Sequence, residues 1–203
     1  LYNPLKFDGG DKSDSITGSD SSFEEFLNGM DGDDYIDGRA GDDNLYGGEG
    51  NDYILGGAGG DSILAEKRDS NDSGGEGNDY VEGGAGVDRV SGGGGNDEIH
   101  GGTEGDGLTG GTGRDRIFGD EGGDIILGDG YFKANEDPTK NLDISIRLQA
   151  DFSKDRDSYN DHLDGGDGDD WINGEAGSDT IIGGEGNDRL IGDRETKENY
   201  ARR

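Results

Sequence analysis

Residues 47–55 read GGEGNDYIL, and close copies stand at 74–82 (GGEGNDYVE) and 183–191 (GGEGNDRLI). Each copy is rich in glycine, carries an Asn-Asp pair and has one aliphatic residue in a constant place. Nine such residues bury too little apolar surface to offset the conformational entropy that folding removes. A single copy therefore cannot fold alone, and the repetition must supply what one copy lacks.

The composition of the whole chain is equally unusual. Its 203 residues include 45 glycines and only 26% hydrophobic residues, and the formal net charge is −31, a combination typical of disordered chains. This charge makes nucleic acid an unlikely ligand by repulsion and favours cations as partners. Because cysteine is absent, disulfides and thiolate metal sites are excluded. No apolar run is long enough to predict a transmembrane segment.

The chain begins at Leu1 without an initiator Met or a visible signal peptide, so we expect it to be part of a longer protein.

A nine-residue period runs through most of the chain. Thirteen units each begin with glycine, and position 6 of every unit is Asp: Asp34, Asp43, Asp52, Asp61, Asp79, Asp88, Asp97, Asp106, Asp115, Asp124, Asp170, Asp179 and Asp188. Position 8 is always aliphatic: Ile36, Leu45, Ile54, Ile63, Val81, Val90, Ile99, Leu108, Ile117, Ile126, Ile172, Ile181 and Leu190. An acidic low-complexity segment would not keep this spacing through thirteen units.

Glycine recurs at positions 2 and 4 as well as at position 1. Position 2 departs from glycine at Met30, Arg39, Asp120 and Glu175, and position 4 departs only at Glu104. Glycine permits backbone angles that are closed to other residues and leaves carbonyl oxygens accessible. We therefore predict a turn over positions 1–6 and a short strand over positions 7–9, with position 8 pointing inward.

The pattern G-G-x-G-x-D-x-U-x resembles the RTX (repeats-in-toxin) calcium-binding nonapeptide repeat, also called the hemolysin-type repeat, over residues 29–127 and 165–191. The resemblance implies an all-β fold, a right-handed parallel β-roll with 18 residues per turn and calcium along both edges. Residues 18 apart then stack, which places Leu45 over Ile63 and Ile36 over Ile54.

In the family, one calcium ion lies between two loops whose starts are 18 residues apart. One loop gives the carbonyls of positions 2 and 4 and its Asp, and the other gives the carbonyls of positions 1 and 3 and its Asp. The resemblance thus implies carbonyl ligands at Met30, Gly32, Arg39, Gly41, Gly47, Glu49, Gly56, Ala58, Gly75, Gly77, Gly84, Gly86, Gly92, Gly94, Gly101, Thr103, Gly110, Thr112, Gly166, Gly168, Gly183 and Glu185. Glu104 puts the site between the loops at 101 and 119 in question.

Residues 65–73 (AEKRDSNDS) interrupt the array. Either they fill one half-turn, so that the loops at 56 and 74 stack, or they loop out and bring the loops at 47 and 74 together. We favour the first arrangement, because nine residues keep the period, although Asp72 would then occupy an inward position. The resulting loop pairs predict about eight to ten calcium ions.

The sequence divides into five parts. Residues 1–28 form a degenerate entry with a weak unit at 9–17, 29–128 a first block, 129–163 an insertion, 164–193 a second block, and 194–203 a tail. The insertion contains DISIRLQADF (143–152), whose alternation predicts a strand. That strand either packs against the roll or belongs to a binding loop.

No catalytic motif is present. The sequence has neither H-E-x-x-H nor G-x-S-x-G, and His100 is expected on the surface. Tyr35 and Tyr53 should stack and stabilise the sheet. We therefore expect a non-catalytic calcium-binding module that folds on binding calcium. The resemblance implies a secreted or cell-surface bacterial protein that uses a type I secretion machinery. The alternative is a ligand- or surface-binding segment of an adhesin, toxin or hydrolase.

Overall fold

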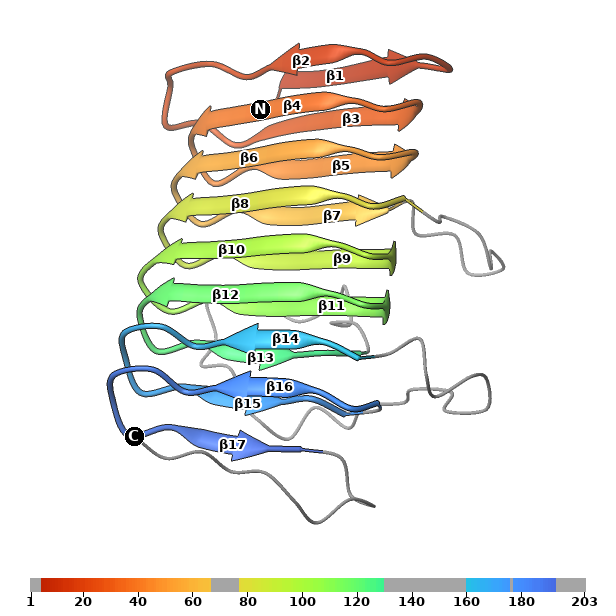
Figure 1. The fold of residues 1–203 in the computed structure, drawn as a ribbon. Helices are drawn as coiled ribbons and strands as arrows, with labels where there is room; N and C mark the ends of the chain where they lie inside the picture. The colour runs from red at the N-terminus through yellow and green to blue at the C-terminus, as the bar shows by residue number, and fades with distance from the viewer. Residues whose placement is uncertain (1–4, 67–76, 130–159, 176, 193–203) are drawn as a thin grey trace.

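The computed structural model describes residues 5–66, 77–129, 160–175 and 177–192. The described residues form two parallel sheets stacked face to face (Figure 1). One sheet contains β1 (Leu5–Gly10), β3 (Glu25–Asp31), β5 (Asn44–Glu49), β7 (Ser62–Glu66), β9 (Arg89–Gly95), β11 (Gly107–Gly113), β13 (Ile125–Leu127), β15 (Trp171–Asn173) and β17 (Arg189–Ile191). The other contains β2 (Ser15–Thr17), β4 (Tyr35–Ala40), β6 (Tyr53–Ala58), β8 (Tyr80–Ala85), β10 (Glu98–Thr103), β12 (Arg116–Glu121), β14 (His162–Asp164) and β16 (Thr180–Ile182).

The chain passes from one sheet to the other after every strand. Each strand pairs in parallel with the strand two places along the chain, so two strands and two turns make one coil. Ile36 lies beside Ile54 and Leu45 beside Ile63, as the 18-residue stacking predicts. The predicted parallel β-roll is confirmed, with about eight coils. The described residues include no helix able to cross a membrane.

The core is only two side chains wide. It consists of the position-8 residues of both sheets, whose side chains meet between the sheets and are fully buried from Leu27 to Ile172. Ile181 and Leu190 in the last coil are partly buried against it. From β2 to β17 each strand contributes one large aliphatic side chain to this core, and β7 also contributes Ala65.

The interruption near residue 65 opens inside a turn. Ile54 pairs with Val81 and Ile63 pairs with Val90, each 27 residues away, so residues 65–73 fill no half-turn. The favoured stacking of the loops at 56 and 74 is therefore wrong. The strand β7 continues through Glu66, which pairs with Gly48, and Gly77 lies against Gly50.

The physical reason is the cost of burial. A half-turn formed by residues 65–73 would place Asp72 at an inward position, and an unpaired charge there is strongly disfavoured. Ala65 and Glu66 instead take positions 1 and 2 of the turn that ends at Asp79.

The larger interruption has the same character. Ile117 pairs with Leu163 and Ile126 with Ile172, each 46 residues away, so the strands on both sides of residues 130–159 belong to the same two sheets. His162 and Leu163, expected inside the insertion, lie in β14. The predicted strand at 143–152 and the tail at 194–203 lie outside the described residues.

The entry segment already has the architecture of the roll. β1 pairs with β3 and β2 with β4, which brings Ile16 beside Ile36 and Leu27 beside Leu45. Residues 5–28 therefore form the first coil, although their sequence departs from the nonapeptide pattern.

A ladder of aromatic rings runs along the outer face of the even-numbered sheet. Tyr35, Tyr53 and Tyr80 stack with centroids 5.6 and 4.6 Å apart, as predicted for the first pair. The ladder continues through His100, Phe118 and His162. Because the rings face each other along the roll axis, they stabilise neighbouring strands and offer mainly their edges to a ligand.

Removal of residues 67–75 tests the placement of the first interruption. The deletion leaves Glu76 alone between Glu66 and Gly77, which restores a nine-residue repeat unit from Ala65 to Glu82. We expect strand content and calcium stoichiometry to stay at the wild-type level, since the deletion removes none of the paired residues of β7 and β8. Circular dichroism and calorimetry measure both.

Removal of residues 83–91 is the matched control, because it deletes the same number of residues and a genuine half-turn with Val90. This control should lose calcium sites and stability. If both deletions are equally damaging, residues 67–75 fill a half-turn after all.

Candidate metal centres

The position-6 carboxylates form one column along each edge of the roll. The first column lies where odd-numbered strands pass to even-numbered ones and contains Asp14, Asp34, Asp52, Asp79, Asp97, Asp115, Asp161 and Asp179. The second column lies at the opposite edge and contains Glu25, Asp43, Asp61, Asp88, Asp106, Asp124, Asp170 and Asp188. Most of these side chains are buried. The thirteen predicted Asp ligands all lie in the two columns.

Within each column the backbone of one coil binds the carboxylate of the next. The main-chain N–H of Asp97 donates to Oδ1 of Asp115 at 3.0 Å, and that of Asp43 donates to Oδ1 of Asp61 at 2.8 Å. Seven such bonds are present in each column. One oxygen of each acceptor carboxylate is therefore satisfied by the fold itself.

The second oxygen of these carboxylates is buried without a protein hydrogen-bond donor. This holds for Oδ2 of Asp34, Asp43, Asp52, Asp61, Asp88, Asp97, Asp106, Asp115, Asp124, Asp161 and Asp170. Burial of an unpaired carboxylate oxygen is costly. The same unpartnered oxygen recurs in register along both edges, and this repetition indicates that a cation interacts with these carboxylates.

The position-1 glycines show where these oxygens point. A Cβ atom on Gly92 would lie 2.3 Å from Oδ2 of Asp97 and 2.7 Å from the carbonyl oxygen of Gly110. Carboxylate and carbonyl oxygens from adjacent coils thus converge beside Gly92. At Gly92, glycine is required because a Cβ atom would collide with these oxygens, rather than because of a special backbone angle. The sequence pattern alone had suggested the angle.

The special angle belongs to positions 2 and 4. In the part of the chain that the structure describes, every residue with positive φ is at one of these positions, including the five that are not glycine: Met30 (85°), Arg39 (72°), Glu104 (76°), Asp120 (69°) and Glu175 (64°). The strained angle expected at Glu104 is confirmed. Its carbonyl faces Gly122 as that of Gly32 faces Gly50, so the loops at 101 and 119 keep the geometry of the array.

Backbone carbonyls from both coils line the gap between turns. The carbonyl oxygens of Met30 and Gly32 face Gly48 and Gly50 of the following turn, while that of Gly47 approaches Gly29. Hard cations such as Ca²⁺ take six to eight oxygen ligands of both kinds. Among the residues that the structure describes, no three His, Asp or Glu side chains are grouped to hold an ion by themselves.

Burial raises the pKa of the column carboxylates. Desolvation is the largest cause, and neighbouring carboxylates of the same column add to it. The pKa rises to about 7 for Asp61, about 8 for Asp106 and about 9 for Asp115. The ion-free columns therefore oppose the charged state that calcium would need.

The structure revises some of the predicted partners. Asp52 adjoins Asp79 and Asp61 adjoins Asp88 across the first interruption, in place of the predicted pairing of the loops at 56 and 74. Glu66 occupies position 2 of the turn that ends at Asp79, where Gly75 was predicted, and Gly75 lies outside the described residues.

Three carboxylates escaped the sequence prediction of ligands. Asp161 joins the first column, and its spacing to Leu163 repeats the Asp-x-aliphatic signal. Asp14 and Glu25 begin the two columns, each two residues before a core side chain, Ile16 or Leu27. That spacing was the available signal.

An additional acidic cluster lies where the chain returns from residues 130–159. The pKa of Glu175 is raised to about 8, chiefly by burial and also by the charges of Asp129, Asp161 and Asp179.

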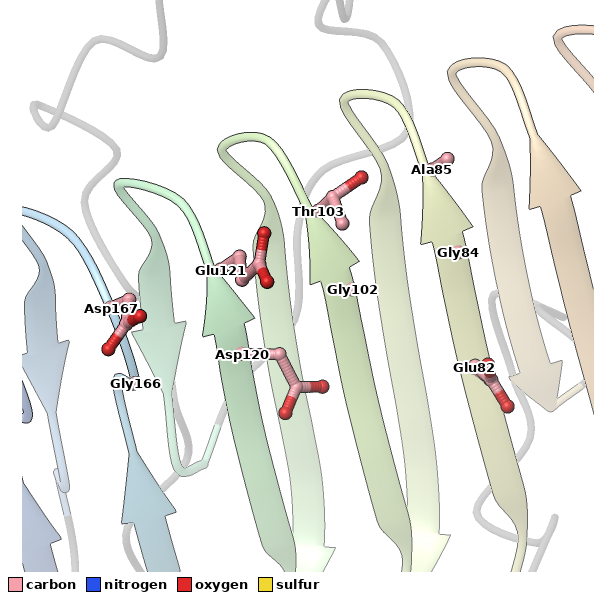
Figure 2. A pocket seen from close by; sticks show the side chains of 9 residues that line it. All are labelled: Glu82, Gly84, Ala85, Gly102, Thr103, Asp120, Glu121, Gly166 and Asp167. Carbon is pink, nitrogen blue, oxygen red and sulfur yellow. The ribbon is translucent and has the colours of Figure 1, made fainter.

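A shallow groove lies on the even-numbered sheet beside the second column (Figure 2). Its charged lining is acidic and comprises Glu82, Asp120, Glu121 and Asp167, with Thr103 between them. These groups add to the negative surface, and Oδ2 of Asp120 lies 3.3 Å from Nδ1 of His100.

The family model of the RTX calcium-binding nonapeptide repeat matches four stretches of the chain, residues 26–63, 73–108, 100–130 and 156–193. Together they cover more than half of the sequence. A search of curated proteins found no match.

A position-1 substitution tests the convergence of oxygens. Gly92→Ala places a methyl group between Asp97 and Gly110, so we expect the loss of one calcium ion and a destabilisation of about 1–3 kcal/mol. Gly192→Ala is the control, because nothing lies within 4 Å of its Cβ position. Calorimetry and thermal unfolding in calcium measure both effects, and equal behaviour of the two variants would contradict the geometry.

The raised pKa values predict how the calcium-free chain responds to pH. A carboxyl whose folded pKa lies above its unfolded value of 3.8 binds more protons when folded, so stability falls as pH rises through the folded pKa. In calcium-free buffer, strand content should therefore be greater at pH 5 than at pH 8. Circular dichroism with light scattering to detect aggregates measures this, and a gain of strand content toward pH 8 would refute it.

Proposed function

We propose that this chain, which belongs to the family of RTX calcium-binding nonapeptide repeats, is a non-catalytic module that folds when it binds calcium. The observation that carries the proposal is the pair of carboxylate columns, in which eleven Asp residues, from Asp34 to Asp170, each have one buried oxygen without a protein hydrogen-bond donor. Asp and backbone oxygens would hold the ions, and a bound ion would supply the positive charge that lets adjacent carboxylates approach.

The number of ions follows from the corrected stacking. Fourteen gaps separate the successive carboxylates, seven per column. Two gaps involve the first coil, and four adjoin the two interrupted turns. The remaining eight lie between uninterrupted turns, which supports about eight to ten calcium ions.

Electrostatics supports coupling of folding to calcium. A chain with a net charge of −31 repels itself in the compact state, and the raised pKa values of the columns show the same penalty locally. Eight divalent ions would remove about half of that charge. The unfolded state is thus favoured without calcium and the folded state with it.

This behaviour suits a secreted bacterial protein. We propose that the module stays unfolded in calcium-poor cytosol, leaves through a type I secretion machinery and folds outside the cell, where weak calcium sites are filled. The alternative role, a ligand-binding segment of an adhesin, toxin or hydrolase, concerns the parent protein and is compatible with this folding behaviour.

Calcium titration of the chelated chain is the test. Far-UV circular dichroism should show little strand structure in EDTA at pH 8 and a strand-rich spectrum after calcium is added. Calorimetry should give about eight to ten ions per chain. Magnesium is the control, since its smaller octahedral shell suits these mixed carboxylate and carbonyl sites poorly.

Two results would overturn the proposal. One is a strand-rich spectrum in EDTA at pH 8, and the other is a stoichiometry of two or three calcium ions.

A further inference from the structure

We propose that the first coil holds a calcium ion at a site that the repeat motif does not mark, with Glu25 in the place of the position-6 Asp. The inference rests on the proposed calcium function but concerns a residue outside the matched stretches, which begin at residue 26. Glu25 stands at the head of the second column, one coil before Asp43.

The first observation is a buried oxygen without a partner. Glu25 is 1% exposed, and its Oε1 has no hydrogen-bond donor. Its Oε2 accepts a hydrogen bond from the main-chain N–H of Ser19 at 2.8 Å. In the array, each carboxylate receives an amide from the preceding coil, but among the described residues Glu25 has no preceding coil in its column. One of its oxygens is therefore left for another ligand.

The carboxylate of Glu25 reaches the same place as an array Asp. A Cβ atom on Gly18 would lie 2.5 Å from Oε2 of Glu25 and 2.4 Å from the carbonyl oxygen of Gly38. The corresponding values at Gly29 are 2.1 Å to Oδ2 of Asp34 and 2.5 Å to the carbonyl oxygen of Gly47. Carboxylate and carbonyl oxygens thus converge at Gly18 as they do in the motif-bearing turns. The converging atom is Oε2, which also accepts the Ser19 amide, and the unpartnered Oε1 is the other oxygen of the same carboxylate.

A second carbonyl in this turn also keeps its register. The carbonyl oxygen of Phe23 lies 2.5 Å from the Cβ position of Gly41, and that of Gly32 lies 2.3 Å from the Cβ position of Gly50. Phe23 therefore takes the place of a position-4 residue. The turn from Gly18 to Glu25 is two residues longer than a motif turn, and this extra length hides the site from a nonapeptide pattern.

The backbone of Glu25 is in register as well. Its main-chain N–H donates to Oδ1 of Asp43 at 2.8 Å, which is the bond that joins successive column residues elsewhere. The gap between the first and second coils thus has a carboxylate on each side. Among the ion pairs of the described residues, none involves Glu25, so no Lys, Arg or His of those residues neutralises it.

Removal of the Glu25 charge is the direct test. Glu25→Gln in the full chain should bind one calcium ion fewer than wild type in calorimetry at pH 8. Glu24→Gln is the matched control, because the neighbouring carboxylate is exposed and the charge change is identical. The control should keep the wild-type number of ions.

The outcomes separate this inference from the proposed function. If wild type binds about eight to ten ions and both variants match it, the Glu25 site is wrong while the calcium module stands. If wild type binds no calcium, the proposed function itself fails.

A second measurement remains decisive if Glu25→Gln does not fold. The side-chain carboxyl ¹³C resonance of Glu25 in the wild-type chain, identified by its absence in Glu25→Asp, should shift when calcium is added to saturation. A resonance that is unchanged while the rest of the chain folds would overturn the inference.

Discussion

The structure depends on one constraint, the burial of a carboxylate oxygen that has no protein hydrogen-bond donor, in most turns of the two columns. In the array, one oxygen of the Asp carboxylate accepts a hydrogen bond from the main-chain N–H of the preceding coil. The other oxygen lies beside the position-1 glycine, as does a carbonyl oxygen of the next coil. Glycine at position 1 leaves room for this approach, and positive φ at positions 2 and 4 turns the carbonyls along the roll axis. With a core only two side chains wide, apolar burial offsets little of such a cost, which is why the proposed function assigns the compensation to bound cations.

Much of the roll could be predicted from sequence because its repeat is local. The spacing of Asp97 and Ile99 fixes a turn ending and an inward strand position, and stacking at 18 residues follows when two such units make one coil. The first interruption could not be placed this way, since the nine-residue period is kept whether residues 65–73 form a half-turn or loop out of the roll. The choice depends on which side chain enters the core, and Ala65 is accommodated at position 1 where a glycine was expected. The role of Gly92 was hidden for a related reason: the missing Cβ matters only against atoms from another coil.

Both interruptions open on the same edge, in turns of the first carboxylate column. In each case the interruption follows position 2 of the turn, and the position-6 Asp keeps its place in the column. The main-chain N–H of Asp52 still donates to Oδ1 of Asp79, and that of Asp115 still donates to Oδ1 of Asp161. The strands and the position-6 residues carry the stacking, and the middle of the turn is the part that tolerates insertion. The second column runs without interruption from Glu25 to Asp188, and six of the eight gaps between uninterrupted turns belong to it.

Anomalous diffraction from crystals grown in calcium tests the central claim most directly. The account predicts two rows of peaks, one along each edge, with every peak at about 2.3–2.6 Å from carboxylate and carbonyl oxygens of adjacent coils. In the second column the peaks should lie beside Oδ2 of Asp61, Asp88 and Asp106. A folded roll with no peaks between its turns, or with calcium bound only to exposed carboxylates on the outer faces, would contradict the account.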